Sequence, residues 1–118
     1  MSKFRPVRET WGAHSAAFIR TGQLLTLLHD LAARVGTSSD EKTYGELTAI
    51  WFEDGKQILD YIETDSRFNS ASFADSLEEQ GDIVDKGDLE SLVHNMKNSA
   101  SAWRKSIGEH GELVFYID

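Results

Sequence analysis

The side chain in this sequence best suited to chemistry is His94. It lies in a stretch whose apolar residues recur at helical spacing, on the side of the expected helix opposite Met96. Lys97 follows one helical turn later. An exposed imidazole can carry a phosphoryl group, and a nearby cation stabilises the charge that the group brings. Two interpretations remain open: His94 accepts a phosphoryl group with help from Lys97, or it is a solvated residue on a polar helix face.

The sequence around His94 resembles the motif of histidine-containing phosphotransfer domains. In that family a helix presents an exposed His, followed at fixed places by an apolar residue, a Lys, a Ser and a small residue. Those places are filled here by Met96, Lys97, Ser99 and Ala100, and the inward-facing places before the His by Leu89 and Leu92. The resemblance implies that His94 would be the phosphoryl acceptor and Lys97 its neighbouring cation.

The acidic residues are the second group of side chains that could carry a function. The chain has a net charge of −8, and residues 35–90 carry fifteen acidic residues against four basic ones. This distribution argues against binding a phosphate backbone, because such binding depends on Lys and Arg. Spaced carboxylates instead suit a basic protein partner. The candidate contact residues are Glu46, Glu53, Asp60, Glu63, Asp75, Glu78, Glu79, Asp82 and Asp85.

Several kinds of chemistry have no support in the sequence. The chain contains no cysteine, which excludes disulfides, thiolate nucleophiles and thiolate metal sites. The spacings Glu-x-x-His and His-x-x-x-His, which join metal ligands on one helix, do not occur, and Glu90 with His94, four residues apart, would supply only two ligands. No phosphate-binding glycine motif follows an expected strand. We therefore expect no metal, no cofactor and no enzymatic activity, apart from the alternative at His94 and Lys97.

Apolar periodicity predicts four helical segments that would position these residues. The second of them would place Glu46, Glu53 and Asp60 on one acidic line, since they recur every seventh residue. Asp88 is the expected N-cap of the last. The segments run from Val7 or Thr10 to Val35 before Gly36, from the capping signals at Ser38 and Thr43 to about Glu63, from about Phe73 to Gln80, and from about Leu89 to Ile107.

The C-terminal tail does not fit a helix. Residues 113–117 are consecutive apolar residues rich in strand formers, and a strand there would need a partner within the chain or in a second copy. The sequence therefore predicts a mainly α fold: a compact bundle of about four helices with a short extended tail that could form a strand. Residues 1–118 would be a single helical domain.

These features favour a small acidic regulatory or inhibitory protein that binds a basic, nucleic-acid-binding protein through an acidic face. Such a face could mimic nucleic acid. Small acidic inhibitors of phage origin, including anti-CRISPR proteins, and immunity proteins share this acidic character, which is an analogy of type. We expect no direct nucleic-acid binding and no membrane association, and a cytoplasmic location. The alternatives are phosphotransfer through His94 and a homodimeric structural or adaptor protein that pairs through its C-terminal tail.

Overall fold

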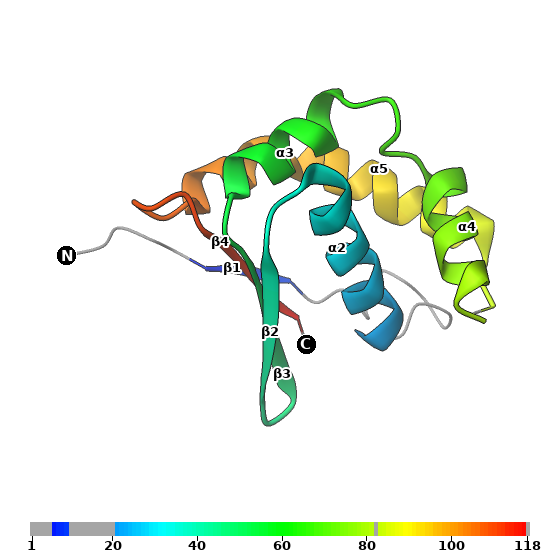
Figure 1. Cartoon of the computed structure of the whole chain (residues 1–118), viewed down its shortest axis with the longest axis horizontal. Helices are drawn as coiled ribbons and strands as arrows, with labels where there is room; N and C mark the ends of the chain where they lie inside the picture. The colour runs from blue at the N-terminus through cyan, green and yellow to red at the C-terminus, as the bar shows by residue number, and fades with distance from the viewer. Residues whose placement is uncertain (1–5, 10–20, 82, 118) are drawn as a thin grey trace.

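A four-stranded mixed sheet forms one layer of the molecule, beneath the helices (Figure 1). The computed structural model describes residues 6–9, 21–81 and 83–117. The strands are β1 (Val7–Glu9), β2 (Ser39–Tyr44), β3 (Leu47–Phe52) and β4 (Leu113–Ile117), and their order is β1-β4-β3-β2. β4 pairs parallel with β1 and antiparallel with β3, while β2 and β3 form an antiparallel hairpin. The fold is therefore α/β, and the expectation of a mainly α, all-helical bundle is wrong.

The β2–β3 hairpin replaces the first part of the second expected helix. Gly45 and Glu46 form a two-residue turn between the strands, and Gly45 has a φ of 61°. That left-handed conformation is easy for glycine and matches the turns that tight hairpins favour. Helix α3 begins later than expected and covers only Gly55–Thr64. Glu46, Glu53 and Asp60 therefore do not form a line along one helix.

Alternation along the strands explains why this segment is a sheet. Ile50 pairs with Phe115, which in turn pairs with Val7, and all three are buried. Phe52 and Ile117 point to the same face and are also buried. Side chains two residues apart point to the same face of a strand, so this set forms one continuous inner face. The Phe115 ring lies 4.9 Å from the Trp103 ring and 6.0 Å from that of Phe52, measured between centroids.

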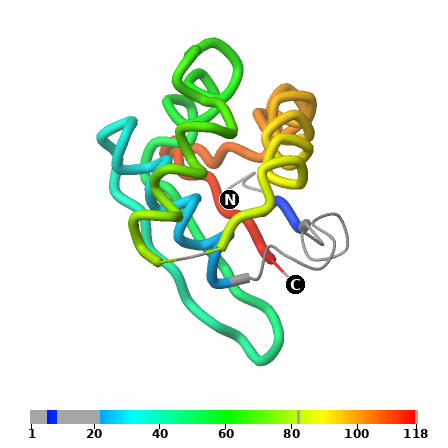
Figure 2. Tube along the Cα trace, turned by 90° about the vertical axis from the view of Figure 1, so that its right-hand side faces the viewer, coloured from blue at the N-terminus to red at the C-terminus, as the bar shows by residue number. Residues whose placement is uncertain are grey.

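Four helices pack on the inner face, and within residues 6–9, 21–81 and 83–117 no helix covers the opposite face (Figures 1 and 2). Figure 2 shows α2 and α5 flanking the line of β4. Their apolar residues join those of the sheet in a single core. The helices are α2 (Thr21–Val35), α3 (Gly55–Thr64), α4 (Ser70–Glu79) and α5 (Lys86–Trp103), and the 3-10 helix η1 (Arg104–Ser106) follows α5.

Helix boundaries other than the start of α3 also differ from the sequence prediction. Residues 7–9 form β1 instead of the start of a helix, and residues 10–20 lie outside the described residues. The first helix ends as expected, before Gly36, whose φ is 86°. The last helix begins at Lys86, because the Asp85 carboxylate caps it by accepting a hydrogen bond from the Asp88 N–H at 3.1 Å.

The C-terminal tail is the strand β4, and it lies between β1 and β3. Both of its edges carry hydrogen bonds within the chain, so the tail has no free edge for pairing with a second copy. The tail is therefore part of the core, and a homodimer would have to form through another surface.

Candidate functional site

The acidic residues expected to form one face lie on separate parts of the structure. Glu46 is in the hairpin turn, and Glu53 directly follows β3. Asp60 and Glu63 lie on α3, whereas Asp75, Glu78 and Glu79 lie on α4 and Asp85 is the N-cap residue of α5. Asp82 lies outside the described residues. Figure 1 places α4 at one end of the molecule and the hairpin turn away from it.

Asp60 and Glu63 are neutralised within the protein. Arg104 donates a hydrogen bond from Nη2 to Asp60 Oδ1 at 2.6 Å and from Nε to Glu63 Oε1 at 2.7 Å. The hydrogen bond to Asp60, followed by that to Glu63, raises the pKa of the Arg104 guanidinium. A carboxylate already held by a cation gains less from a second one, so these two residues contribute least to a docking face.

The acidic residues of α4 are different because no basic side chain neutralises them. Asp75, Glu78 and Glu79 are exposed and form no ion pair with another described residue. Their spacing of three and four residues places them on neighbouring positions of the helix surface. Asp85 is also exposed, and it is the N-cap residue of α5. We call these four residues the α4 acidic surface.

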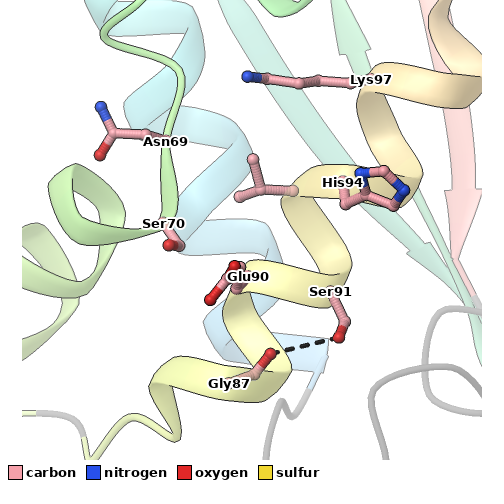
Figure 3. Close-up of a pocket in the computed structure, with 8 residues that line it drawn as sticks. Asn69, Ser70, Gly87, Glu90, Ser91, His94 and Lys97 are labelled. Atoms are coloured by element: carbon pink, nitrogen blue, oxygen red, sulfur yellow. Dashed lines mark hydrogen bonds between the residues drawn. The ribbon is translucent and has the colours of Figure 1, made fainter.

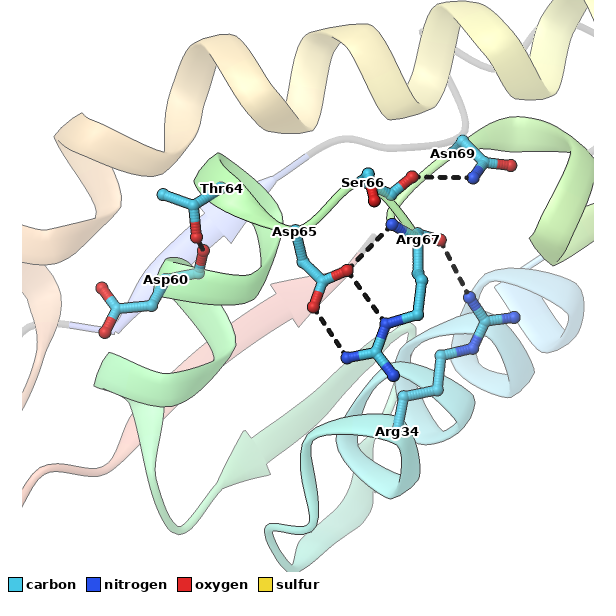
Figure 4. Close-up of polar contacts among 7 residues, drawn as sticks. All are labelled: Arg34, Asp60, Thr64, Asp65, Ser66, Arg67 and Asn69. Carbon is cyan, nitrogen blue, oxygen red and sulfur yellow. Dashed lines mark hydrogen bonds and ion pairs between the residues drawn. The ribbon is translucent and has the colours of Figure 1, made fainter.

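Basic residues near the start of α4 are committed to internal contacts (Figure 4). Arg67 donates two hydrogen bonds to the Asp65 carboxylate, at 3.0 and 2.7 Å, and these hydrogen bonds lower the pKa of Asp65 to about 2. Arg34 donates to the Ser72 carbonyl at 3.2 Å, and its guanidinium lies 4.1 Å from the Phe73 ring centroid. Arg34 thus holds α4 against α2, Arg67 is occupied by Asp65, and neither arginine neutralises the α4 acidic surface.

His94 lines an open hollow of about 580 Å³ between the start of α4 and α5 (Figure 3). The ring is exposed, and its Nε2 lies 3.1 Å from the Asn98 side-chain nitrogen. Lys97 also lines the hollow, but Figure 3 shows its side chain extending toward the loop of Asn69 while the His94 ring points the other way. Glu90 adds a carboxylate to the same hollow. His94 and Lys97 thus lie on the same helix, α5, but their side chains point in different directions.

A second hollow, of about 630 Å³, was missed by sequence reasoning. It lies beside Trp51, which is half-buried, and we call it the Trp51 hollow. Three carboxylates contribute to it. Its lining residues are Ser38, Ser39, Asp40, Trp51, Glu53, His110 and Glu112. The signal that could have revealed it is the period of two in residues 47–53 and 112–116, which places alternate residues on one sheet face.

Among residues 6–9, 21–81 and 83–117, no group of three or more His, Asp or Glu side chains is arranged to hold a metal ion. Within the same residues, no helix combines the length and the apolar character that crossing a bilayer requires.

Comparisons with known proteins add no further identification. Searches with protein-family models, among curated proteins and among solved structures each gave no match to this chain.

Proposed function

We propose that this protein is a small regulatory or inhibitory protein that binds a basic protein partner through the α4 acidic surface. The observation that carries the proposal is the exposure of Asp75, Glu78 and Glu79 on α4 without an ion pair in the described structure. The proposal keeps the cytoplasmic location expected from the sequence.

The proposed contact is electrostatic and therefore has a defined physical signature. Unpaired carboxylates attract Lys and Arg side chains of an approaching protein, which raises the association rate more than it tightens the final complex. Salt screens such a contact, because the Debye length falls from about 10 Å at 0.1 M to about 3 Å at 1 M. A partner that normally binds nucleic acid would present a suitable basic groove, in which the carboxylates would take the place of phosphates.

The test is capture of partners from an extract of the organism that encodes the protein, at low and at high salt. The variant Asp75→Lys/Glu79→Lys should lose the proteins that the unmodified chain retains at low salt. The control Glu46→Lys/Glu109→Lys makes the same change in net charge at exposed residues away from α4. If both variants retained the same proteins as the unmodified chain, the α4 acidic surface would not be the docking site.

A second candidate function is phosphotransfer through His94. It is favoured by the exposure of the imidazole in a hollow that it shares with Lys97 and Ser70. In such a step an imidazole nitrogen forms a bond to phosphorus, the bond from phosphorus to the donor's leaving oxygen breaks, and the imidazole loses a proton. Incubation with acetyl phosphate should then produce an acid-labile label that His94→Gln lacks. An unlabelled wild-type chain would remove this candidate.

A further inference from the structure

The sheet face opposite the helices carries a continuous set of apolar side chains, and we call it the outer face. Tyr44 is 51% exposed, and most of the others are half-buried, whereas the inner-face residues of β3 and β4 are almost completely buried. The strand register places these residues beside one another. The apolar residues of the outer face are Tyr44, Leu47, Ala49, Trp51, Val114 and Tyr116, and the register places Lys42 and Arg8 on the same face, beside Ala49 and Tyr116.

Acidic residues gather at one end of the outer face, around Trp51. Asp40 is the direct cross-strand partner of Trp51, and so lies on the same face. Glu53 continues the alternation two residues after Trp51, and its N–H donates to the Ser38 carbonyl at 2.9 Å, which extends the hairpin ladder. Glu112 reaches the same face two residues before Val114. All three carboxylates line the Trp51 hollow.

The charges of the Trp51 hollow are not balanced within the described structure. Asp40, Glu53 and Glu112 form no ion pair there, and the contact of the Asp40 carboxylate is with the neighbouring N–H of Glu41, at 2.8 Å. The Glu112 oxygen Oε2 is completely buried and has no hydrogen-bond partner. Asp40 and Glu53 are exposed, so an approaching cation can reach their carboxylates, whereas the buried Oε2 of Glu112 is closed to it.

Trp51 supplies the second element of a cation site. Aromatic faces attract cations, and Trp does so most strongly. Cation–π contacts occur within this protein: the Lys42 ammonium, for example, lies 5.4 Å from the Tyr44 ring centroid on the same outer face. Among the described residues, no Lys or Arg lies over the Trp51 ring. An arginine or lysine side chain from outside could stack on this ring and donate hydrogen bonds to the surrounding carboxylates.

We propose that the Trp51 hollow binds an arginine or lysine side chain of a partner polypeptide, with the outer face as the docking surface around it. Charge complementarity selects this occupant, since three unpaired carboxylates disfavour an acidic or phosphorylated partner. The site is separate from the α4 acidic surface, because Figure 1 places α4 and the segment of residues 108–113 at opposite ends of the molecule. The inference therefore does not rest on the function proposed for α4.

The test uses the full chain, labelled with ¹⁵N, and two short peptides as probes. One is Gly-Arg-Gly-Arg-Gly with blocked ends, and the other carries citrulline in place of arginine, which keeps the shape and removes the charge. The arginine peptide should shift the indole N–H signal of Trp51 in a saturable way. The indole N–H signal of the buried Trp103 is the internal reference and should not move. The citrulline peptide should bind about threefold more weakly, since a single exposed ion pair contributes about 0.2–1 kcal/mol.

Variants separate the proposed site from a general attraction of opposite charges. Asp40→Asn/Glu53→Gln should weaken binding of the arginine peptide at least about threefold, because it removes two of the carboxylates without altering the strands. Glu46→Gln/Glu90→Gln, which makes the same change in net charge at exposed residues outside both the Trp51 hollow and the α4 acidic surface, should leave the Trp51 signal and the peptide affinity unchanged. Trp51→Leu, checked for folding by circular dichroism, should lose binding. Equal shifts with both peptides, or equal effects of the two double variants, would overturn the proposal and leave the α4 proposal standing.

Discussion

Arg104 Nη2 donates a hydrogen bond to Asp60 Oδ1 at 2.6 Å. This contact joins η1, which follows the last helix, to α3. Because Arg104 also contacts Glu63, one guanidinium takes two carboxylates out of the acidic surface that the sequence suggests. The acidic residues that remain free on α4 and around Trp51 are the ones that the two binding proposals use.

The Arg104 contacts should contribute modestly to stability. Arg104→Gln should lower the free energy of unfolding by about 1 kcal/mol, because the guanidinium is 33% exposed and exposed pairs are weakened by water and salt. Lys105→Gln, an exposed neighbour, is the matched control and should change little. Urea denaturation at low and high salt measures both. A loss that persisted unchanged in 1 M salt would contradict the electrostatic origin.

Gly55 should tolerate no side chain, because a Cβ there would lie 2.6 Å from the Cβ of Leu113 in β4. Gly55→Ala should therefore destabilise the protein by about 1–3 kcal/mol through overpacking at the junction of α3 and the sheet. Gly22→Ala is the control. A Cβ at residue 22, in the first turn of α2, meets nothing within 4 Å. That change should leave stability unaltered or raise it by up to about 1 kcal/mol. Thermal unfolding would compare the stabilities of Gly55→Ala and Gly22→Ala. Equal melting temperatures for the two variants would contradict the close packing of Gly55 against Leu113.

Substitutions of Gly45 in the β2–β3 turn should affect stability through the backbone conformation that the new residue prefers, and little through the size of its side chain. Its φ is 61°, and a Cβ there would meet no atom within 4 Å. Gly45→Ala should cost about 1 kcal/mol, because an alanine Cβ disfavours the left-handed region, whereas Gly45→Asn should cost less. Urea unfolding followed by Trp fluorescence would rank the two. Equal losses for both variants would argue against a left-handed residue in this turn.

Asp65 should make stability depend on pH in the acidic range. Hydrogen bonds from Arg67 lower its pKa from 3.8 to about 2 in the folded state. An acid with a lowered folded pKa stabilises the protein above its unfolded pKa, and that stabilisation is lost as the pH falls from about 4 to about 2. Asp65→Asn should therefore lower the melting temperature at pH 6 and reduce its decline between pH 4 and pH 2.

The control for this pH dependence is Asp75→Asn, which removes an exposed carboxylate that has no ion pair in the described structure. This variant should keep the decline of the unmodified protein between pH 4 and pH 2. An identical decline in Asp65→Asn and in the unmodified chain would show that the contact with Arg67 does not govern acid stability.

Residue order alone determined the local features of this protein. The apolar spacing from Leu89 to Trp103 identified the buried side of α5, because a helix is closed by hydrogen bonds between residues that are near in sequence. The end of α2 at Gly36 followed in the same way. The excess of acidic residues between residues 35 and 90 was likewise evident from composition.

Tertiary structure decided which segments form the sheet and which charges remain free. The run from Leu47 to Phe52 has apolar residues that also fit a helix, and its strand conformation is stabilised by pairing with β4 from the far end of the chain. Contacts between residues distant in sequence decide three features: the pairing of β4 with β1 and β3, the part of the outer face where Val114 lies beside Trp51, and the contact of Arg104 with Asp60. Local periodicity carries no information about such contacts, because they form when the chain packs in three dimensions.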